Sequence, residues 1–200
     1  EPDKLRMLAR LDIPETAPVV GMAAHPHPGR GHALFLRAAA RIREDVADAC
    51  FVIAGISAHT DLRSDLKIRA REYGLSERII IPGGEVELDV PQLVDIMDIF
   101  VHPAQRSEPF GRDIVQAMML GKPVVASASG GPEEIVRNAE TGILADSGDS
   151  VRLARAVVQL LDNPEVMRAF GENGRRRAME LYTMERTVRS LESLLEQMNS

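Results

Sequence analysis

The chain is 200 residues long, 44% hydrophobic and 27% charged, with a formal net charge of -6 at pH 7. This is enough apolar sequence for one domain with a full core. The acidic balance argues against a general nucleic-acid or anionic-membrane partner, although a local basic pocket is compatible with it. Cys50 has no second cysteine to pair with, so no disulfide can form within the chain, and we expect it in a buried strand.

No apolar stretch approaches the ~20 residues of a membrane span, and the N-terminus lacks the charged and apolar regions of a secretory signal. We therefore expect a cytoplasmic protein. The cluster Arg175-Arg176-Arg177 is too narrow for a membrane-binding patch and is most simply a solvated helix face. A peripheral association of the full-length protein with the inner face of the cell membrane stays open.

Short apolar runs alternate with segments of helical period, without an internal repeat or a low-complexity segment. Steady alternation of strand and helix predicts an α/β fold with a doubly wound, Rossmann-like parallel sheet and a C-terminal helical tail. In chain order, strands are expected at 19–23, 51–54, 78–81, 99–102 and 123–127. Helices are expected at 31–43, 61–73, 90–97, over the helical-period run 114–119, from 131 onward, and at 150–161, 164–181 and 184–198.

The loop after the first expected strand, residues 21–32, is where nucleotide-binding motifs usually occur. It contains neither G-x-G-x-x-G nor a Walker G-x-x-x-x-G-K-[ST], which disfavours a dehydrogenase or a P-loop ATPase. The loop holds His25, His27 and His32, but no Asp or Cys accompanies them, so a metal site is not expected. A solvated or loop-packing role for these histidines is the alternative.

Two later strands feed helices through loops that contain glycine. Pro109 and Gly111 follow the fourth expected strand, and Gly130 and Gly131 follow the fifth. Ligands of open α/β sheets bind beyond the carboxyl ends of the strands, where free N–H groups at a helix start favour an anion. Two such loops can grip one diphosphate, with Glu108 at the mouth of the crevice. Glycines after strands are common in doubly wound folds, so neither loop alone would be specific.

The order and spacing of these loops closely resemble the donor-site signature of the retaining GT-B glycosyltransferases of family 4, the group 1 type. That signature reads E-x7-E, G-x-P-V-V-A and G-G-x-x-E, matched here by 108–116, 121–126 and 130–134, and then by 141–144, where the family has a T-G-x-L strand. The resemblance implies the second half of a GT-B fold. It divides the chain into a linker helix (1–17), a Rossmann-like core (18–146) and a helical tail (147–200), with the N-terminal acceptor domain absent from the chain. The isolated domain is then expected to be inactive.

The resemblance also implies roles for individual residues. The family's first motif glutamate faces the transferred sugar, which makes Glu108 the catalytic residue. The family neutralises the donor diphosphate with an Arg and a Lys, whose places are taken here by His25 and Arg30. Arg30 can hold phosphate oxygens bidentately, whereas a histidine is charged only in part near neutral pH, so donor affinity should fall as the pH rises. The other donor-binding residues implied are Gly31, Gly83 in the loop that meets the base, Phe110, Gly111, Gln116, Gly130, Gly131 and Glu134.

The chain departs from the motif at Gln116, which stands where the family has its second glutamate. A carboxylate that accepts ribose hydroxyls makes charge-assisted bonds of about 1.5–3 kcal/mol, against about 0.5–1.5 kcal/mol for neutral ones. We therefore expect donor affinity to fall by roughly five- to tenfold without being lost. Because the chain has no D-x-D motif, we expect donor binding to need no metal ion and no other cofactor.

The predicted function is the donor-binding part of a retaining glycosyltransferase, which moves a sugar from a nucleoside-diphosphate sugar to an acceptor hydroxyl in polysaccharide or glycoconjugate biosynthesis. Its expected partners are the nucleotide-sugar donor, the missing N-terminal domain and an acceptor that the sequence does not identify. No nucleic-acid partner is expected. A degenerate module with weak or no donor binding, acting as a scaffold, is the alternative that His25 and Gln116 support. Another GT-B-like enzyme, such as a sugar-nucleotide epimerase or a phosphorylase, is disfavoured by the combined motifs. The donor base stays open between UDP, GDP and ADP.

The segment Tyr182-Thr183-Met184-Glu185 resembles the family's F-S/T-x-E, which precedes a last helix that crosses back toward the first domain. Without that domain, the apolar face of the helix is expected to be exposed, or to pack on this domain or on a second copy. This face comprises Leu191, Leu194, Leu195 and Met198.

Overall fold

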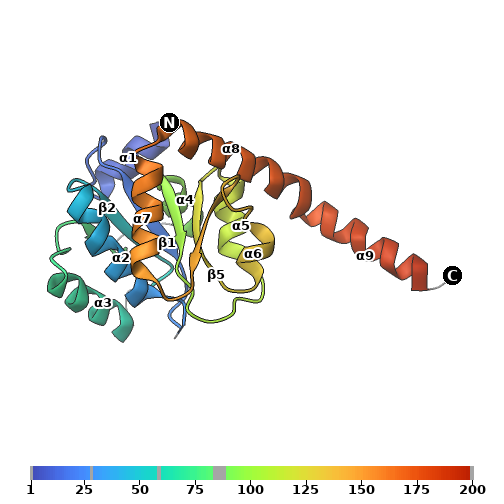
Figure 1. The fold of residues 1–200 in the computed structure, drawn as a ribbon, viewed down its shortest axis with the longest axis horizontal. Coiled ribbons are helices and arrows are strands. Elements are labelled where there is room, and N and C mark those ends of the chain that lie inside the picture. Colours follow the sequence, from blue (N-terminus) through green and yellow to red (C-terminus); the bar gives the residue numbers. More distant parts are fainter. Residues whose placement is uncertain (1, 28, 58–59, 83–88, 199–200) are drawn as a thin grey trace.

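The protein folds around a six-stranded parallel sheet flanked by helices on both faces, as the computed structural model in Figure 1 shows. The structure describes residues 2–27, 29–57, 60–82 and 89–198. Its strands are β1 (Val19–Ala23), β2 (Cys50–Ala54), β3 (Ile79–Ile80), β4 (Ile99–His102), β5 (Val124–Ala128) and β6 (Gly142–Asp146). Its helices are α1 (Pro2–Arg10), α2 (His32–Asp45), α3 (Asp61–Glu72), α4 (Val90–Asp95), α5 (Arg112–Met119), α6 (Gly131–Ile135), α7 (Ser150–Leu161), α8 (Pro164–Leu181) and α9 (Met184–Met198).

The strand order is β3-β2-β1-β4-β5-β6, so the direction of winding reverses between β1 and β4. Every neighbouring pair is parallel, with Val20 opposite Phe51 in β2 and opposite Ile99 in β4. In a doubly wound sheet this reversal opens a crevice beyond the carboxyl ends of the two central strands. The predicted fold class, a Rossmann-like parallel α/β sheet with a C-terminal helical tail, is confirmed.

The core consists of two apolar layers, one on each face of the sheet. Val20 and Met22 of β1 point into the layer under α2, α3 and α7, whereas Val19 and Ala23 point into the layer under α4 and α5. This alternation follows from the two-residue period of a strand. Because both faces are covered, the central strands are apolar except for His102 at the end of β4, which is why they could be found as continuous runs in the sequence.

One strand differs from its prediction. Residues 78–81 were expected to form a buried strand, but β3 is only Ile79–Ile80 and both residues are half-buried. The reason is its place at the edge of the sheet, where it pairs with β2 alone and has a neighbour on one side only. Lone Cys50 lies buried at the start of β2, as expected.

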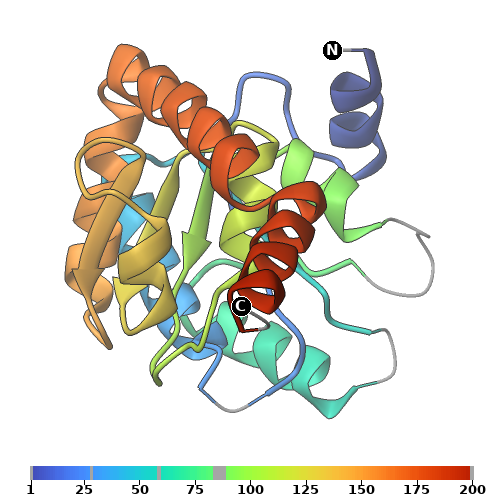
Figure 2. The same cartoon turned by 90° about the vertical axis from the view of Figure 1, so that its right-hand side faces the viewer.

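The helical tail starts on the body of the protein and ends away from it. Helix α7 packs beside α2, and α8 packs on α5, whereas α9 projects into solvent in Figure 1 and toward the viewer in Figure 2. No described residue of α9 is buried, and Met198 is 82% exposed. The expected exposure of the apolar face of this helix is therefore found, and the alternative that it packs on this domain is not. Among the described residues, no helix combines the length and apolar character that crossing a membrane requires.

Candidate functional site

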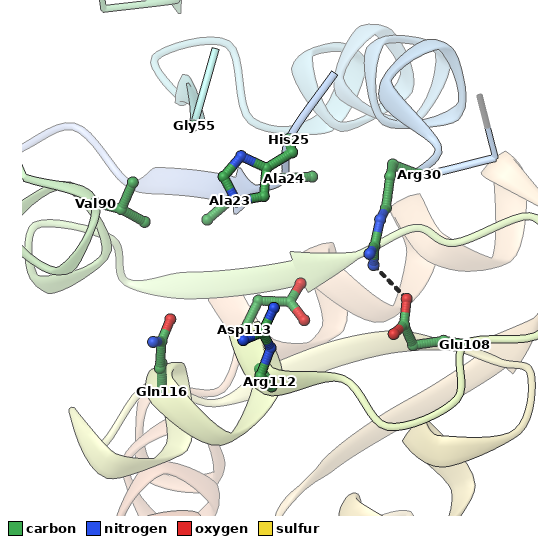
Figure 3. Close-up of a pocket in the computed structure, with 10 residues that line it drawn as sticks. All are labelled: Ala23, Ala24, His25, Arg30, Gly55, Val90, Glu108, Arg112, Asp113 and Gln116. Carbon is green, nitrogen blue, oxygen red and sulfur yellow. Dashed lines mark hydrogen bonds and ion pairs between the residues drawn. The ribbon is translucent and has the colours of Figure 1, made fainter. Parts of the chain in front are cut away.

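A pocket lies beyond the carboxyl ends of β1, β2 and β4, at the point where the strand order reverses (Figure 3). Its walls come from the loops that follow these strands, from the start of α4, and from the first turns of α5. The described residues that line it are Ala23, Ala24, His25, Arg30, Gly55, Val90, Glu108, Arg112, Asp113 and Gln116. Four of the residues predicted from the sequence, His25, Arg30, Glu108 and Gln116, thus face one cavity.

Close packing between two loops fixes the position of Arg30. The backbone N–H of Gln105, in the loop after β4, donates to the carbonyl of Gly29 at 2.8 Å. Gly31 has a φ of +83°, and a Cβ on it would lie 1.7 Å from the carbonyl oxygen of Pro103. Only glycine fits here, because both the backbone conformation and the space exclude a side chain. Arg30 is thereby held at the rim of the pocket, opposite the loop that carries Glu108.

Glu108 lies at the centre of the loop network. Its carboxylate forms an ion pair with the Arg30 guanidinium, and its side chain is only 13% exposed. Its backbone N–H donates to the Ser129 carbonyl at 2.9 Å, and its carbonyl accepts the N–H of Gly131 at 2.8 Å. The two glycine-containing loops predicted from the sequence are therefore joined through Glu108. This arrangement fixes the backbone of the acid while its carboxylate faces the cavity (Figure 3).

The other predicted residues that the structure describes do not line the pocket. Gly111 precedes the first turn of α5, and Gly130 and Gly131 begin α6 beside Glu108. The ring of Phe110 turns away and packs edge-to-face on Tyr182, with centroids 5.9 Å apart. The side chain of Glu134 is exposed, and Gly83 lies outside the described residues.

The structure adds a pair of residues that the sequence reasoning missed. Asp113, in the first turn of α5, lies 2.7 Å from Nδ1 of His102, the last residue of β4. The imidazole is 3% exposed, and its Nε2 is buried with no hydrogen-bond partner in the described structure. The available signal was a histidine at the end of an apolar strand and an acid three residues before Gln116, on the same helix face.

A second buried histidine, His32, begins α2 directly after the loop that follows β1. Burial lowers the pKa of His32, a hydrogen bond with the Ala24 backbone raises it, and the charge of Arg30 lowers it. The net direction is downward, so the fold favours the neutral imidazole. His32 therefore packs under the loop as a neutral side chain, and it supplies no positive charge that could bind an anion.

The lowered pKa of His32 makes the stability of the fold depend on pH. Below the ordinary histidine pKa of about 6.5, the unfolded chain takes up a proton that the folded chain refuses. His32 should therefore make its full contribution to the free energy of unfolding above this pH. As the pH drops toward the folded pKa, the free energy of unfolding should fall by at most about 1.4 kcal/mol per pH unit. Urea unfolding across this range should show the slope, and His32→Gln should flatten it.

The matched control for that measurement is His27→Gln, since His27 is exposed on the same loop. The control should keep the slope of the unmodified protein. An unchanged slope in His32→Gln would show that another group causes the pH dependence.

In the part of the chain that the structure describes, no three His, Cys, Asp or Glu side chains gather in a way that could hold a metal ion. The charged groups around the pocket are instead the cations Arg30 and Arg112 and the acids Glu108 and Asp113. The pocket is thus suited to a ligand with both an anionic and a hydroxyl-bearing part.

Comparison with known proteins places this geometry in a family. Residues 3–177 match the family model of the group 1 glycosyl transferases, and the chain belongs to that family. It is 31% identical over 188 residues to the D-inositol 3-phosphate glycosyltransferase of Salinispora tropica, covering 91% of this chain and 39% of the relative. The resemblance identified in the sequence is thereby confirmed.

Solved structures show the same fold. The structure of Anabaena Alr3699/HepE in complex with UDP matches with a TM-score of 0.88 at 25% identity, over 98% of this chain and 53% of that one. The C-terminal domain of a group 1 glycosyl transferase from Francisella tularensis matches with a TM-score of 0.78 at 22% identity, over 90% of this chain and 93% of that one. The chain thus spans 39% of the D-inositol 3-phosphate glycosyltransferase and 53% of Alr3699/HepE, but almost all of an isolated C-terminal domain.

Proposed function

We propose that this chain is the donor-binding domain of a retaining glycosyltransferase, which moves a sugar from a nucleoside-diphosphate sugar to an acceptor hydroxyl. The observation that carries the proposal is the meeting of Arg30, Glu108 and Gln116 around one pocket at the reversal of the strand order. The UDP bound to Alr3699/HepE supports a nucleoside diphosphate as the class of ligand.

In this proposal, the diphosphate lies at Arg30, beside the N-cap of α5 at Gly111. Arg30 offers two parallel N–H groups to phosphate oxygens, and the free N–H groups of the helix start add a partial positive charge. These groups stabilise the negative charge that the leaving diphosphate gains, which is a preorganised electrostatic contribution to catalysis. The proposal needs no metal ion and no other cofactor for this neutralisation.

Glu108 takes the side of the transferred sugar. As the diphosphate leaves, positive charge develops at the anomeric carbon, and a nearby carboxylate stabilises it while accepting sugar hydroxyls. The Arg30–Glu108 ion pair holds both groups at the border between phosphate and sugar before the donor arrives.

The acceptor site and the remaining catalytic groups belong, in this proposal, to a second domain. The proposed parts of this chain are a linker helix (1–17), a core (18–146) and a tail (147–200). The match covers 39% of the Salinispora tropica enzyme, which supports a further domain in the whole protein. Donor binding, but not transfer, is therefore the activity to measure on this chain.

The first experiment is calorimetric titration of the protein with UDP, GDP and ADP and with their glucose and mannose conjugates. One base should bind saturably. Glu108→Gln should then weaken the sugar conjugate by roughly tenfold relative to the bare nucleotide, because a charge-assisted bond to a hydroxyl is replaced by a neutral one. For the retaining outcome, NMR of the product made by the full-length protein should show the anomeric configuration of the donor.

Absence of binding to every probe at millimolar concentration, in this chain and in the full-length protein, would refute the proposal and favour the degenerate scaffold module. Binding of a bare nucleotide with no response of the conjugates to Glu108→Gln would refute only the role of Glu108. An inverted product would refute the retaining mechanism and leave the donor site intact.

A further inference from the structure

We propose that Asp113, positioned by His102, is a second carboxylate of the donor site and accepts hydroxyl groups of the bound nucleotide or of its sugar. This inference rests on the proposed function, because it assigns a further binding residue to the same pocket. The family motif does not include either residue, so the assignment rests on the geometry of this chain.

The position of Asp113 is the first argument. It lies in the first turn of α5 and lines the pocket together with Gln116, three residues further on the same face of the helix. In Figure 3 its carboxylate points into the cavity, between Gln116 and the Arg30–Glu108 pair. A ligand that reaches from Arg30 toward Gln116 must therefore pass this carboxylate.

The way in which Asp113 is held is the second argument. One carboxylate oxygen, Oδ2, is 2.7 Å from Nδ1 of His102, whose ring is buried at the end of β4. The other oxygen, Oδ1, has no hydrogen bond in the described structure, and the side chain is 20% exposed. His102 thus holds the Asp113 carboxylate through Oδ2 and leaves Oδ1 for a ligand.

The tautomer of His102 agrees with this role. Its Nε2 is buried and has no partner among the described residues. A buried N–H without an acceptor is costly, so the favoured ring is the one that carries its proton on Nδ1 and donates it to Asp113. The histidine then acts as a positioning residue and leaves Asp113 as an acceptor.

The charge of the pocket decides what Asp113 can bind. A carboxylate repels phosphate, so the anionic part of the ligand is expected at Arg30, and a hydroxyl at Asp113. No described cation pairs with Asp113, since Arg30 is engaged by Glu108 and Arg112 forms no ion pair in the described structure. A carboxylate with a free oxygen beside the Gln116 amide suits neighbouring hydroxyls, which a ribose and a hexose both provide.

The test compares ligands that differ by a hydroxyl group. UDP, 2′-deoxy-UDP, 3′-deoxy-UDP and UDP-glucose, or their guanosine or adenosine equivalents if GDP or ADP proves to be the base, are titrated against the unmodified protein and Asp113→Asn. If the ribose is bound, Asp113→Asn should weaken UDP by roughly tenfold, and the deoxy analogue that lacks the bound hydroxyl by less than about twofold. If the transferred sugar is bound, only UDP-glucose should lose affinity. Both results support the proposal and identify the hydroxyls.

Two further variants test whether His102 positions Asp113 and whether a general loss of negative charge explains the result. His102→Leu should reproduce the same ligand pattern with a smaller loss, and should add little to Asp113→Asn, because both changes remove one interaction. Asp45→Asn removes the same charge from the exposed end of α2 and should leave all affinities unchanged. Thermal melts of each variant show that the fold is retained.

Equal changes for UDP, both deoxy analogues and UDP-glucose would overturn the inference, since a purely electrostatic or structural effect does not depend on a hydroxyl. Absence of binding of the uridine, guanosine and adenosine probes to the unmodified chain and to the full-length protein would instead overturn the proposed function, and the inference with it. The two failures are therefore distinguishable.

Discussion

Replacing Gly31 by alanine should destabilise the protein by on the order of 3–5 kcal/mol, the largest effect on folding that we expect from a one-carbon change near the site. The new Cβ would lie 1.7 Å from the carbonyl oxygen of Pro103, on a backbone with a φ of +83°. Because this contact is with backbone, the clash cannot be relieved by a side-chain rotation. The loop after β1 would have to move away from the loop after β4, and Arg30 would move with it.

Gly148→Ala is the matched control, because Gly148 has a φ of +82° but no atom of the described residues within 4 Å of its added Cβ. It should cost only about 1–2 kcal/mol, the price of a left-handed conformation in an L residue. Urea unfolding measures both variants. Similar losses in the two would show that backbone conformation alone explains the effect, and that the two loops do not depend on their contact at Pro103.

The fold could be predicted largely because its determinants are local. Apolar strands such as Phe51–Ala54 are covered on both faces, and helix stops such as Gly74 mark the ends of the segments between them. The crevice followed from the order of strands and helices, since the carboxyl ends of parallel strands meet at one edge. The edge strand was overestimated because a run of isoleucines does not reveal that it has one neighbour only.

The sequence predicted several residues of the candidate site, but not which of these residues contact one another. The motif resemblance selected Glu108 and Arg30 as separate contacts, and their ion pair emerges only when the loops after β1 and β4 are packed together. The His102–Asp113 pair is set by how the end of β4 faces the first turn of α5. The two residues lie on different elements joined by a loop, so neither the strand period nor the helix period relates them.

Arg30→Ala should weaken binding of a nucleoside diphosphate by roughly 10- to 100-fold, the equivalent of about 1.5–3 kcal/mol for charge-assisted bonds. The loss has two causes. The diphosphate loses its bidentate partner, and Glu108 loses the cation that neutralises it, so that an unpaired carboxylate then faces the anionic ligand. Arg30→Lys should recover only part of the affinity, because an ammonium keeps the charge but not the planar fork. Calorimetric titration with the nucleotide that the unmodified protein binds measures all three proteins.

The second cause can be isolated with the double variant Arg30→Ala, Glu108→Gln. If the unpaired carboxylate repels the diphosphate, the double variant should bind the bare nucleotide more tightly than Arg30→Ala alone, so the two changes are not additive. Arg41→Ala removes the same charge from α2 outside the pocket, where Arg41 donates only to the Arg37 carbonyl among the described residues, and should leave the affinity unchanged. A loss in Arg41→Ala equal to that in Arg30→Ala would mean that general charge, and not the ion pair at the pocket rim, holds the phosphate. A loss of affinity in Arg30→Ala that is absent from Arg41→Ala and partly restored by Glu108→Gln would instead show that Arg30 and Glu108 act together. The diphosphate then binds the Arg30 guanidinium in competition with the Glu108 carboxylate.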